Sequence, residues 1–128
     1  MCIEKAHKQL KVWKESIELV RMVYELTSHL PVEEKYGLVS QMRRAAISVP
    51  SNLAEGAARQ TDRDSLQFFI VARGSLSELD TQLEVIRALG LLKVEVYTPL
   101  ESKMETVDAL LNGLIRFRRN RKSRSVKL

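Results

Sequence analysis

The feature that most constrains the fold of this chain is a run of apolar residues at helical spacing that continues past a proline. Six residues that recur every three or four positions fall on one helix face at about 100° per residue: Leu38, Met42, Ala45, Val49, Leu53 and Gly56. Pro50 lies within this run, and it has no N–H to donate to the carbonyl of Ala46. The pattern predicts one amphipathic helix over about residues 33–58, kinked at Pro50.

Three more amphipathic helices are predicted, over about residues 11–29, 62–89 and 99–118. Pro31 ends the first of them, because proline disfavours helical geometry in the residue before it. Gly90 closes the 62–89 helix as a left-handed residue after its last turn. Thr98 and Pro99 are typical of a helix start, in which threonine is the N-cap and proline is the first helical residue.

Four amphipathic segments joined by short connections, without an internal repeat or an alternating strand pattern, predict an all-α fold. The expected architecture is an antiparallel up-down four-helix bundle over residues 1–119. Residues 120–128 are basic and lack the apolar content to pack. We therefore expect a tail that is disordered until it binds a partner.

The 62–89 helix is more apolar than one buried face requires. Its expected core stripe consists of Ser65, Phe68, Ala72, Ser75, Leu76, Leu79, Leu83 and Ile86. Leu66, Phe69 and Ile70 lie off this stripe, and a second apolar patch is typical of a partner surface, so we predict an oligomer interface there. Gly74, at a propensity cost of about 1 kcal/mol relative to alanine, either allows close approach of another helix or is tolerated on an outer face.

The formal charge of +5 is unevenly distributed along the chain. Residues 116–128 hold seven Lys and Arg and no acidic residue, which leaves residues 1–115 with a net charge of −2. Such a segment can neutralise phosphates without reading a sequence. The candidate nucleic-acid-binding residues are Arg43, Arg44, Arg59, Arg63, Arg73, Arg116, Arg118, Arg119, Arg121, Lys122 and Arg124.

Two sets of residues have alternative interpretations. Arg43 and Arg44 lie either on a solvated face or in an ion pair between subunits, or they contact phosphate, which suits the planar guanidinium. Trp13 and Tyr24 share the expected buried stripe of the first helix, so a core position is favoured over a base-stacking platform.

The residue patterns that usually carry catalysis or metal binding do not occur. No Glu-x-x-His pair of the di-iron bundle type is present, and His29, although flanked by Glu25 and Glu33, is expected at the surface. Neither Ser48 nor Ser51 has a glycine-framed nucleophile turn. We expect no enzyme activity, cofactor, metal or small-molecule substrate. The apolar runs are too short to cross a bilayer, so we expect a cytoplasmic protein without a membrane partner.

Several ordered motifs resemble those of a bacterial family, the proteins encoded in intervening sequences of 23S ribosomal RNA. They are QMRRAAISVPSNLAEG at residues 41–56, VWK at 12–14, EKYGL at 34–38 and ARGSL at 72–76, with shorter matches at 23–24, 26–27, 30–31 and 78–79. The resemblance implies a small helical bundle that assembles as a five-fold ring. It also implies a shape similar to that of the accessory protein of diversity-generating retroelements, which binds nucleic acid.

Two functions from different classes follow from these observations. The first is a homo-oligomeric, pentameric module that binds nucleic acid, RNA rather than DNA, through its basic surface and tail. The second is an oligomeric scaffold that holds protein partners and has no nucleic-acid ligand, its tail serving only solubility.

Overall fold

The structure, a computed structural model, describes residues 6–127 and the side chains of residues 7, 8 and 10–121. In this part of the chain all regular structure is helical, as predicted, and no strand is present. The α-helices are α1 (Lys11–Thr27), α2 (Ser40–Ala57), α3 (Asp62–Leu89) and α4 (Val94–Lys127). Short helices precede α1 and α2: η1 (Ala6–Gln9), the 3₁₀-helix η2 (Val32–Glu34) and the π-helix η3 (Lys35–Val39).

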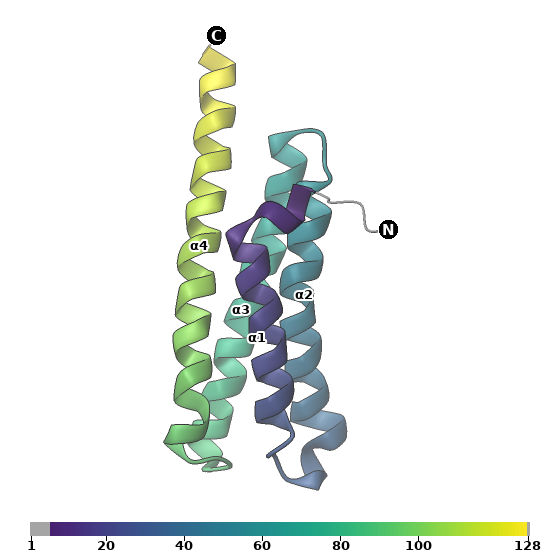
Figure 1. Ribbon diagram of the computed structural model, residues 1–128, viewed down its shortest axis with the longest axis vertical. Helices are drawn as coiled ribbons and strands as arrows, with labels where there is room; N and C mark the ends of the chain where they lie inside the picture. Colours follow the sequence, from purple (N-terminus) through teal and green to yellow (C-terminus); the bar gives the residue numbers. More distant parts are fainter. Residues whose placement is uncertain (1–5, 128) are drawn as a thin grey trace.

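Consecutive α-helices run in opposite directions, and the four lie side by side along the long axis of the molecule (Figure 1). Contacts between their side chains give the register. Ser65 of α3 bonds to Gly56 of α2, and Ser75 of α3 bonds to Ser48 of α2, so the two helices are antiparallel. The connection between α2 and α3 and the far end of α4 therefore lie at one end of the bundle, called the upper end below (Figure 1).

The stripe predicted for α2 is buried along its whole length, from Leu38 to Gly56. The stripe predicted for α1 is rotated: the buried residues are Val12, Ser16, Leu19, Val23, Leu26 and Thr27. Tyr24, which we expected in the core, is 39% exposed, and Ile17 on the same helix is 45% exposed. Thr27 and Ser16 occupy buried positions because their hydroxyls donate to the carbonyls of Val23 and Trp13.

A small polar cluster joins α2 to α3 next to Pro50. The α-helix of α2 is continuous through Pro50, and the predicted kink stays a prediction. The side-chain Nδ2 of Asn52 donates to the backbone carbonyl of Ser48 at 2.8 Å, and the hydroxyl of Ser75 donates to the Ser48 hydroxyl at 2.8 Å. The small polar residues beside the proline thus hold the neighbouring helix.

Gly56 allows α2 and α3 to approach closely. A Cβ built on Gly56 would lie 2.5 Å from Cε1 of Phe69, and the Ser65 hydroxyl donates to the Gly56 carbonyl at 2.7 Å. Phe69 is fully buried, and Leu66 is 8% exposed. The predicted oligomer interface is therefore wrong for these two residues, because both pack inside their own bundle.

Helix α4 begins earlier than predicted. It starts at Val94, and the Thr98 hydroxyl donates to the Val94 carbonyl at 2.7 Å, as a threonine inside a helix does. Glu101, three residues after Thr98, pairs with Arg87 of α3 at 2.7 Å. The prediction that Thr98 caps the helix is therefore wrong. Gly90, at φ 61°, closes α3 in the left-handed conformation, as predicted.

At its other end, α4 continues to Lys127 and extends past the other three helices (Figure 1). Residues 120–127, for which we predicted disorder, are the last turns of this helix. Extending an existing helix needs no new nucleus, so a segment without a packing partner can continue it.

Candidate nucleic-acid interface

Asp62 organises the basic residues at the upper end of the bundle. It is the first residue of α3, and its carboxylate accepts hydrogen bonds from Arg121 of α4 at 2.6 and 3.0 Å. Arg118 bonds to the same carboxylate at 3.3 Å, and its guanidinium lies 5.4 Å from the centre of the Phe69 ring. One carboxylate thus fixes two arginines of α4 against the start of α3.

The ionisation of Asp62 reflects these partners. The hydrogen bond from Arg121, and then the positive charges of Arg121 and Arg118, hold the pKa of Asp62 below its ordinary value of 3.8, against the opposing effect of burial. The same hydrogen bond raises the pKa of Arg121. Negative charge at the positive end of the α3 dipole is favourable as well.

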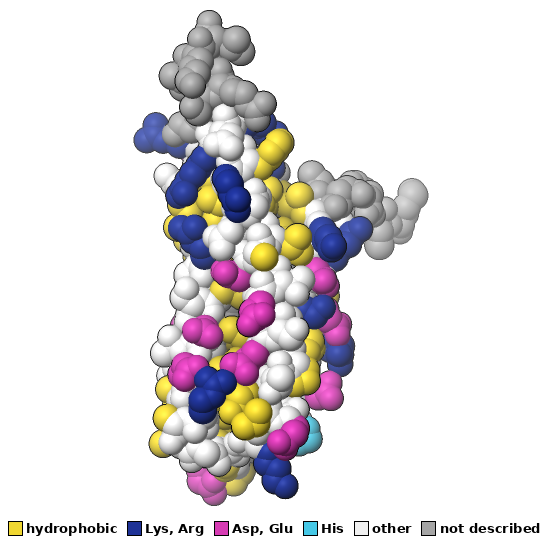
Figure 2. Space-filling model, turned by 90° about the vertical axis from the view of Figure 1, so that its left-hand side faces the viewer, with side chains coloured by type: hydrophobic (Ala, Val, Ile, Leu, Met, Phe, Trp, Pro, Cys, Tyr) yellow, Lys and Arg dark blue, Asp and Glu magenta, His cyan; other side chains and the backbone are white. Residues whose placement is uncertain are grey.

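Three more arginines at this end point to solvent. Arg63 of α3 and Arg116 and Arg119 of α4 are exposed, and none of them has an ion-pair partner among the described side chains. Arg59, in the connection before α3, pairs with Glu55 at 3.0 Å and lies over the Phe68 ring at 4.5 Å. In the face shown in Figure 2, dark blue side chains gather at the upper end, whereas acidic side chains cover the middle of the bundle.

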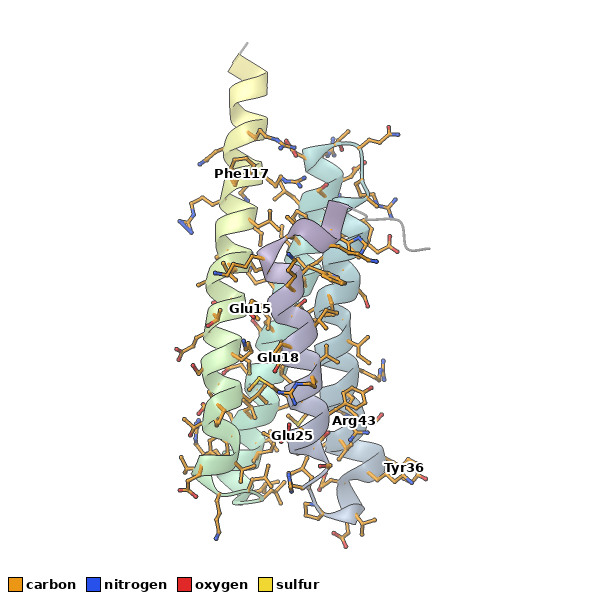
Figure 3. All side chains as sticks on the ribbon, viewed as in Figure 1. Glu15, Glu18, Glu25, Tyr36, Arg43 and Phe117 are labelled. Carbon is orange, nitrogen blue, oxygen red and sulfur yellow. The ribbon has the colours of Figure 1, made fainter. Side chains whose placement is uncertain are left out.

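The other candidate arginines lie elsewhere on the molecule. Arg43 is held between α1 and α2, where its Nε donates to the Thr27 hydroxyl at 2.9 Å and its guanidinium stacks 4.3 Å from the Tyr24 ring (Figure 3). Arg44 is exposed on α2 beside a hollow that Glu78 also lines. Arg73 bonds to Asn112 of α4 at 3.3 Å. Lys122 and Arg124 lie outside the described side chains.

Phe117 is a residue of this end that the sequence reasoning did not single out. It is 51% exposed and lies on the upper part of α4 (Figure 3). Its ring centre is 5.6 Å from the Arg121 guanidinium. The position of Phe117 beyond Ile115, the last described core residue of α4, could have indicated its exposure.

Of the predicted oligomer interface, only Ile70 reaches the surface, at 40% exposure. Val71 beside it is 51% exposed, and a Cβ on Gly74 would meet nothing within 4 Å. Within one copy, Gly74 therefore lies on an outer face and does not allow close approach of another helix of the same bundle.

A groove between α3 and α4 is acidic. Its volume is about 430 Å³, and the residues that line it are Leu76, Ser77, Asp80, Thr81, Glu101, Met104, Glu105 and Asp108. Within residues 6–127, no three His, Cys, Asp or Glu side chains are grouped as metal ligands would be. In the same part of the chain, none of the helices is both long enough and apolar enough to span a membrane.

The fold and its basic end define the class of this protein, which is a small, all-α four-helix bundle with an extended cationic last helix. Residues 8–113 match the family described as 23S rRNA-intervening sequence protein, so the chain belongs to that family, as the motifs indicated. The matched range ends before Arg116, so it does not include the basic end of α4.

A solved structure supports the same fold. A Bacteroides thetaiotaomicron protein, described as having unknown function and belonging to the S23 ribosomal protein family, superposes with a TM-score of 0.75. The two sequences are 22% identical, and the match covers 82% of this chain and 95% of that one. At this identity the likeness shows the fold. No curated protein sequence matches the chain.

Proposed function

We propose that this protein is a non-enzymatic module that binds nucleic acid with the upper end of its bundle. The observation that carries the proposal is a set of three exposed arginines, Arg63, Arg116 and Arg119, that have no ion-pair partner among the described side chains. They lie beside Arg118 and Arg121, which Asp62 fixes. Guanidinium groups on rigid helices suit phosphate contacts, which provide affinity without sequence specificity.

RNA is the preferred ligand in this proposal because the family is named for a ribosomal RNA element. Assembly as a homopentamer, which the family resemblance implies, would multiply the local concentration of basic ends and raise the avidity for a long strand. The acidic groove on the side of the bundle argues for contact at the end rather than along the flank.

The test is RNA affinity as a function of salt for two matched double variants. R116Q/R119Q removes two exposed charges from the upper end, whereas K35Q/K93Q removes two exposed charges from the lower end. We expect R116Q/R119Q to weaken binding and to lower the slope of log K against log salt by about 1.5, since each lost phosphate contact lowers it by about 0.7 to 0.9. K35Q/K93Q should leave both unchanged.

A deletion complements these variants. It should remove residues 122–128 and keep Arg118, which is partly buried against Asp62 and Phe69. The expected result is weaker, less salt-dependent binding by a protein that loses only the helical signal of the deleted last turns of α4. Wild-type protein that shows no affinity at low salt, or equal losses in both double variants, would refute the proposal.

The second candidate is an oligomeric scaffold for protein partners. Ile70, Val71 and Gly74 favour it, because they form an apolar and small outward face on α3. Ile70→Glu should then lower the mass measured by light scattering without loss of helix, with Ser102→Glu, exposed on α4 outside this face, as the control. An unchanged mass would remove this support. Nucleic-acid binding lost in R116Q/R119Q would favour the first candidate.

A further inference from the structure

We propose that Phe117 is a stacking platform for an unpaired base, so that the preferred ligand is a single strand or a loop rather than a regular duplex. The proposal rests on the proposed function, because it concerns the same end of the bundle. It adds a class of ligand that phosphate contacts alone do not select.

Exposure of Phe117 follows from its place on α4. Leu114 and Leu110, one and two turns earlier on the same side of the helix, are partly buried against the core. Phe117 lies two residues past Ile115, where no buried residue of α4 follows in the described side chains. Its ring is therefore half open to solvent, although a phenylalanine gains free energy from burial.

The surroundings of the ring are cationic. The Arg121 guanidinium lies 5.6 Å from its centre and is itself held by Asp62 at 2.6 Å. Arg116 and Arg119 lie on the same stretch of α4 but on other sides of the helix, and they are exposed and have no ion pair among the described residues. An aromatic ring beside positive charges is the arrangement with which proteins bind single strands, because the base stacks on the ring while the phosphates contact the cations.

The other strongly exposed aromatic residue of the described chain has different neighbours. Tyr36, at the lower end, is 87% exposed and points away from the bundle (Figure 3). Glu33 and Glu34 precede it, and their charges disfavour phosphate nearby. Lys35 Nζ also lies 5.4 Å from the centre of the Tyr36 ring, but the two carboxylates beside it offset this single positive charge. Tyr36 is therefore a matched control: an exposed aromatic ring with one neighbouring cation but without a net positive environment.

A regular duplex cannot use this platform, since its bases are already stacked on one another, whereas the bases of a single strand or loop are free to stack on a side chain. The inference therefore predicts a difference between two ligands of equal length. The probes are a short oligouridine and an RNA duplex, measured by fluorescence anisotropy with the full-length protein.

Phe117→Leu keeps an apolar helix former but removes the aromatic face. We expect it to weaken binding of the oligouridine on the order of ten-fold and to leave duplex binding within about two-fold. Phe117→Tyr should restore single-strand binding, and Tyr36→Leu should change neither ligand. A 2-aminopurine placed in the strand should report stacking by a fluorescence change with wild-type protein that Phe117→Leu abolishes.

Three results would overturn the inference. Equal affinity of wild-type protein and Phe117→Leu for the oligouridine would show that the ring does not contact a base. Equal losses for both ligands would show a general disturbance of the basic end. A lower mass of Phe117→Leu by light scattering would show that the ring packs against a second copy. If Phe117→Leu binds the oligouridine as tightly as wild-type protein does, the proposed function can still hold. It would be supported by salt-dependent duplex binding that is lost when Arg116 and Arg119 are replaced.

Discussion

Gly56 is a residue at which α2 and α3 pack closely. A Cβ at this position would lie 2.5 and 2.8 Å from two atoms of the buried Phe69 ring and 3.0 Å from the Ser65 carbonyl oxygen. Gly56→Ala should therefore lower the free energy of unfolding by about 1–3 kcal/mol, as overpacking does. The better helix propensity of alanine, about 1 kcal/mol, offsets only part of this. Urea unfolding followed by circular dichroism measures the difference.

Gly74 provides the matched control for this prediction. It is also inside α3, but nothing lies within 4 Å of a Cβ at that position. Gly74→Ala should raise the free energy of unfolding by up to about 1 kcal/mol, because the propensity gain meets no steric cost. A loss of stability in Gly74→Ala would contradict the open outer face, and a gain in Gly56→Ala would contradict the close packing.

Asp62 makes stability depend on pH at the upper end. Its pKa is lower in the folded protein than its ordinary value of 3.8, so the folded state binds fewer protons at this site than the unfolded state. Its contribution is fully present above the ordinary value and is lost as the pH falls through the folded pKa. Asp62→Asn should therefore lower stability at pH 7 and flatten the acid limb below about pH 4. Parallel acid unfolding curves for the two proteins would refute this role.

At the scale of the elements, helix α3 shows why one stripe was too narrow a prediction. Its position between α2 and α4 gives it two buried flanks: Ser65 and Ser75 bond towards α2, while Arg73 and Arg87 bond towards α4. The 3.6-residue period locates the centre of the buried arc but not its width. This is why Leu66 and Phe69 were predicted to face a partner. The Phe69 ring is buried because Gly56 leaves space for it, and this contact between two helices cannot be predicted from the pattern of one helix.

Local signals predicted the ends of α3 but not the start of α4. Thr61 caps α3 by accepting from the Asp64 N–H at 3.2 Å, and Gly90 closes it, because both conformations depend on the residues themselves. Thr98 and Pro99 form an equally strong local signal. Here the tertiary contact between Glu101 and Arg87, and the burial of Tyr97 at 3% exposure, accompany a start one turn earlier.

The start of α4 is open to a direct test with Thr98→Ala. If Thr98 were the N-cap, its loss would lower stability by about 1 kcal/mol. Because the threonine lies inside the helix and is exposed, we expect a change within about 0.5 kcal/mol, with alanine the better helix former. Thr61→Ala, which removes the cap of α3, is the control that should lower stability by about 1 kcal/mol. Equal losses in the two variants would place the start of α4 at Pro99.

At the scale of the whole molecule, the uneven distribution of charge could be predicted from the sequence, whereas only part of the candidate site could be. A count of charges separates a net −2 over residues 1–115 from seven basic residues after them. Contacts across the bundle decide which arginines have partners. Arg43 is bound by Thr27 and Tyr24, and Arg118 by Asp62, whereas Arg116 and Arg119 have no ion pair with any side chain that the structure describes. Phe117 could be assigned to the site only from the structure, because its exposure depends on where the other helices end.

This separation predicts how the acidic groove affects RNA binding at the end of the bundle. Asp108 lies eleven residues before Arg119 on α4, about 16 Å along the axis at 1.5 Å per residue. The screening length is about 8 Å at physiological salt and about 30 Å at 0.01 M. The variant E105Q/D108N should therefore leave RNA affinity within about two-fold at physiological salt and raise it at 0.01 M, by fluorescence anisotropy. An equal rise at both salt concentrations would mean that RNA lies along the flank, beside the groove, because only a charge within the screening length of the phosphates acts at high salt.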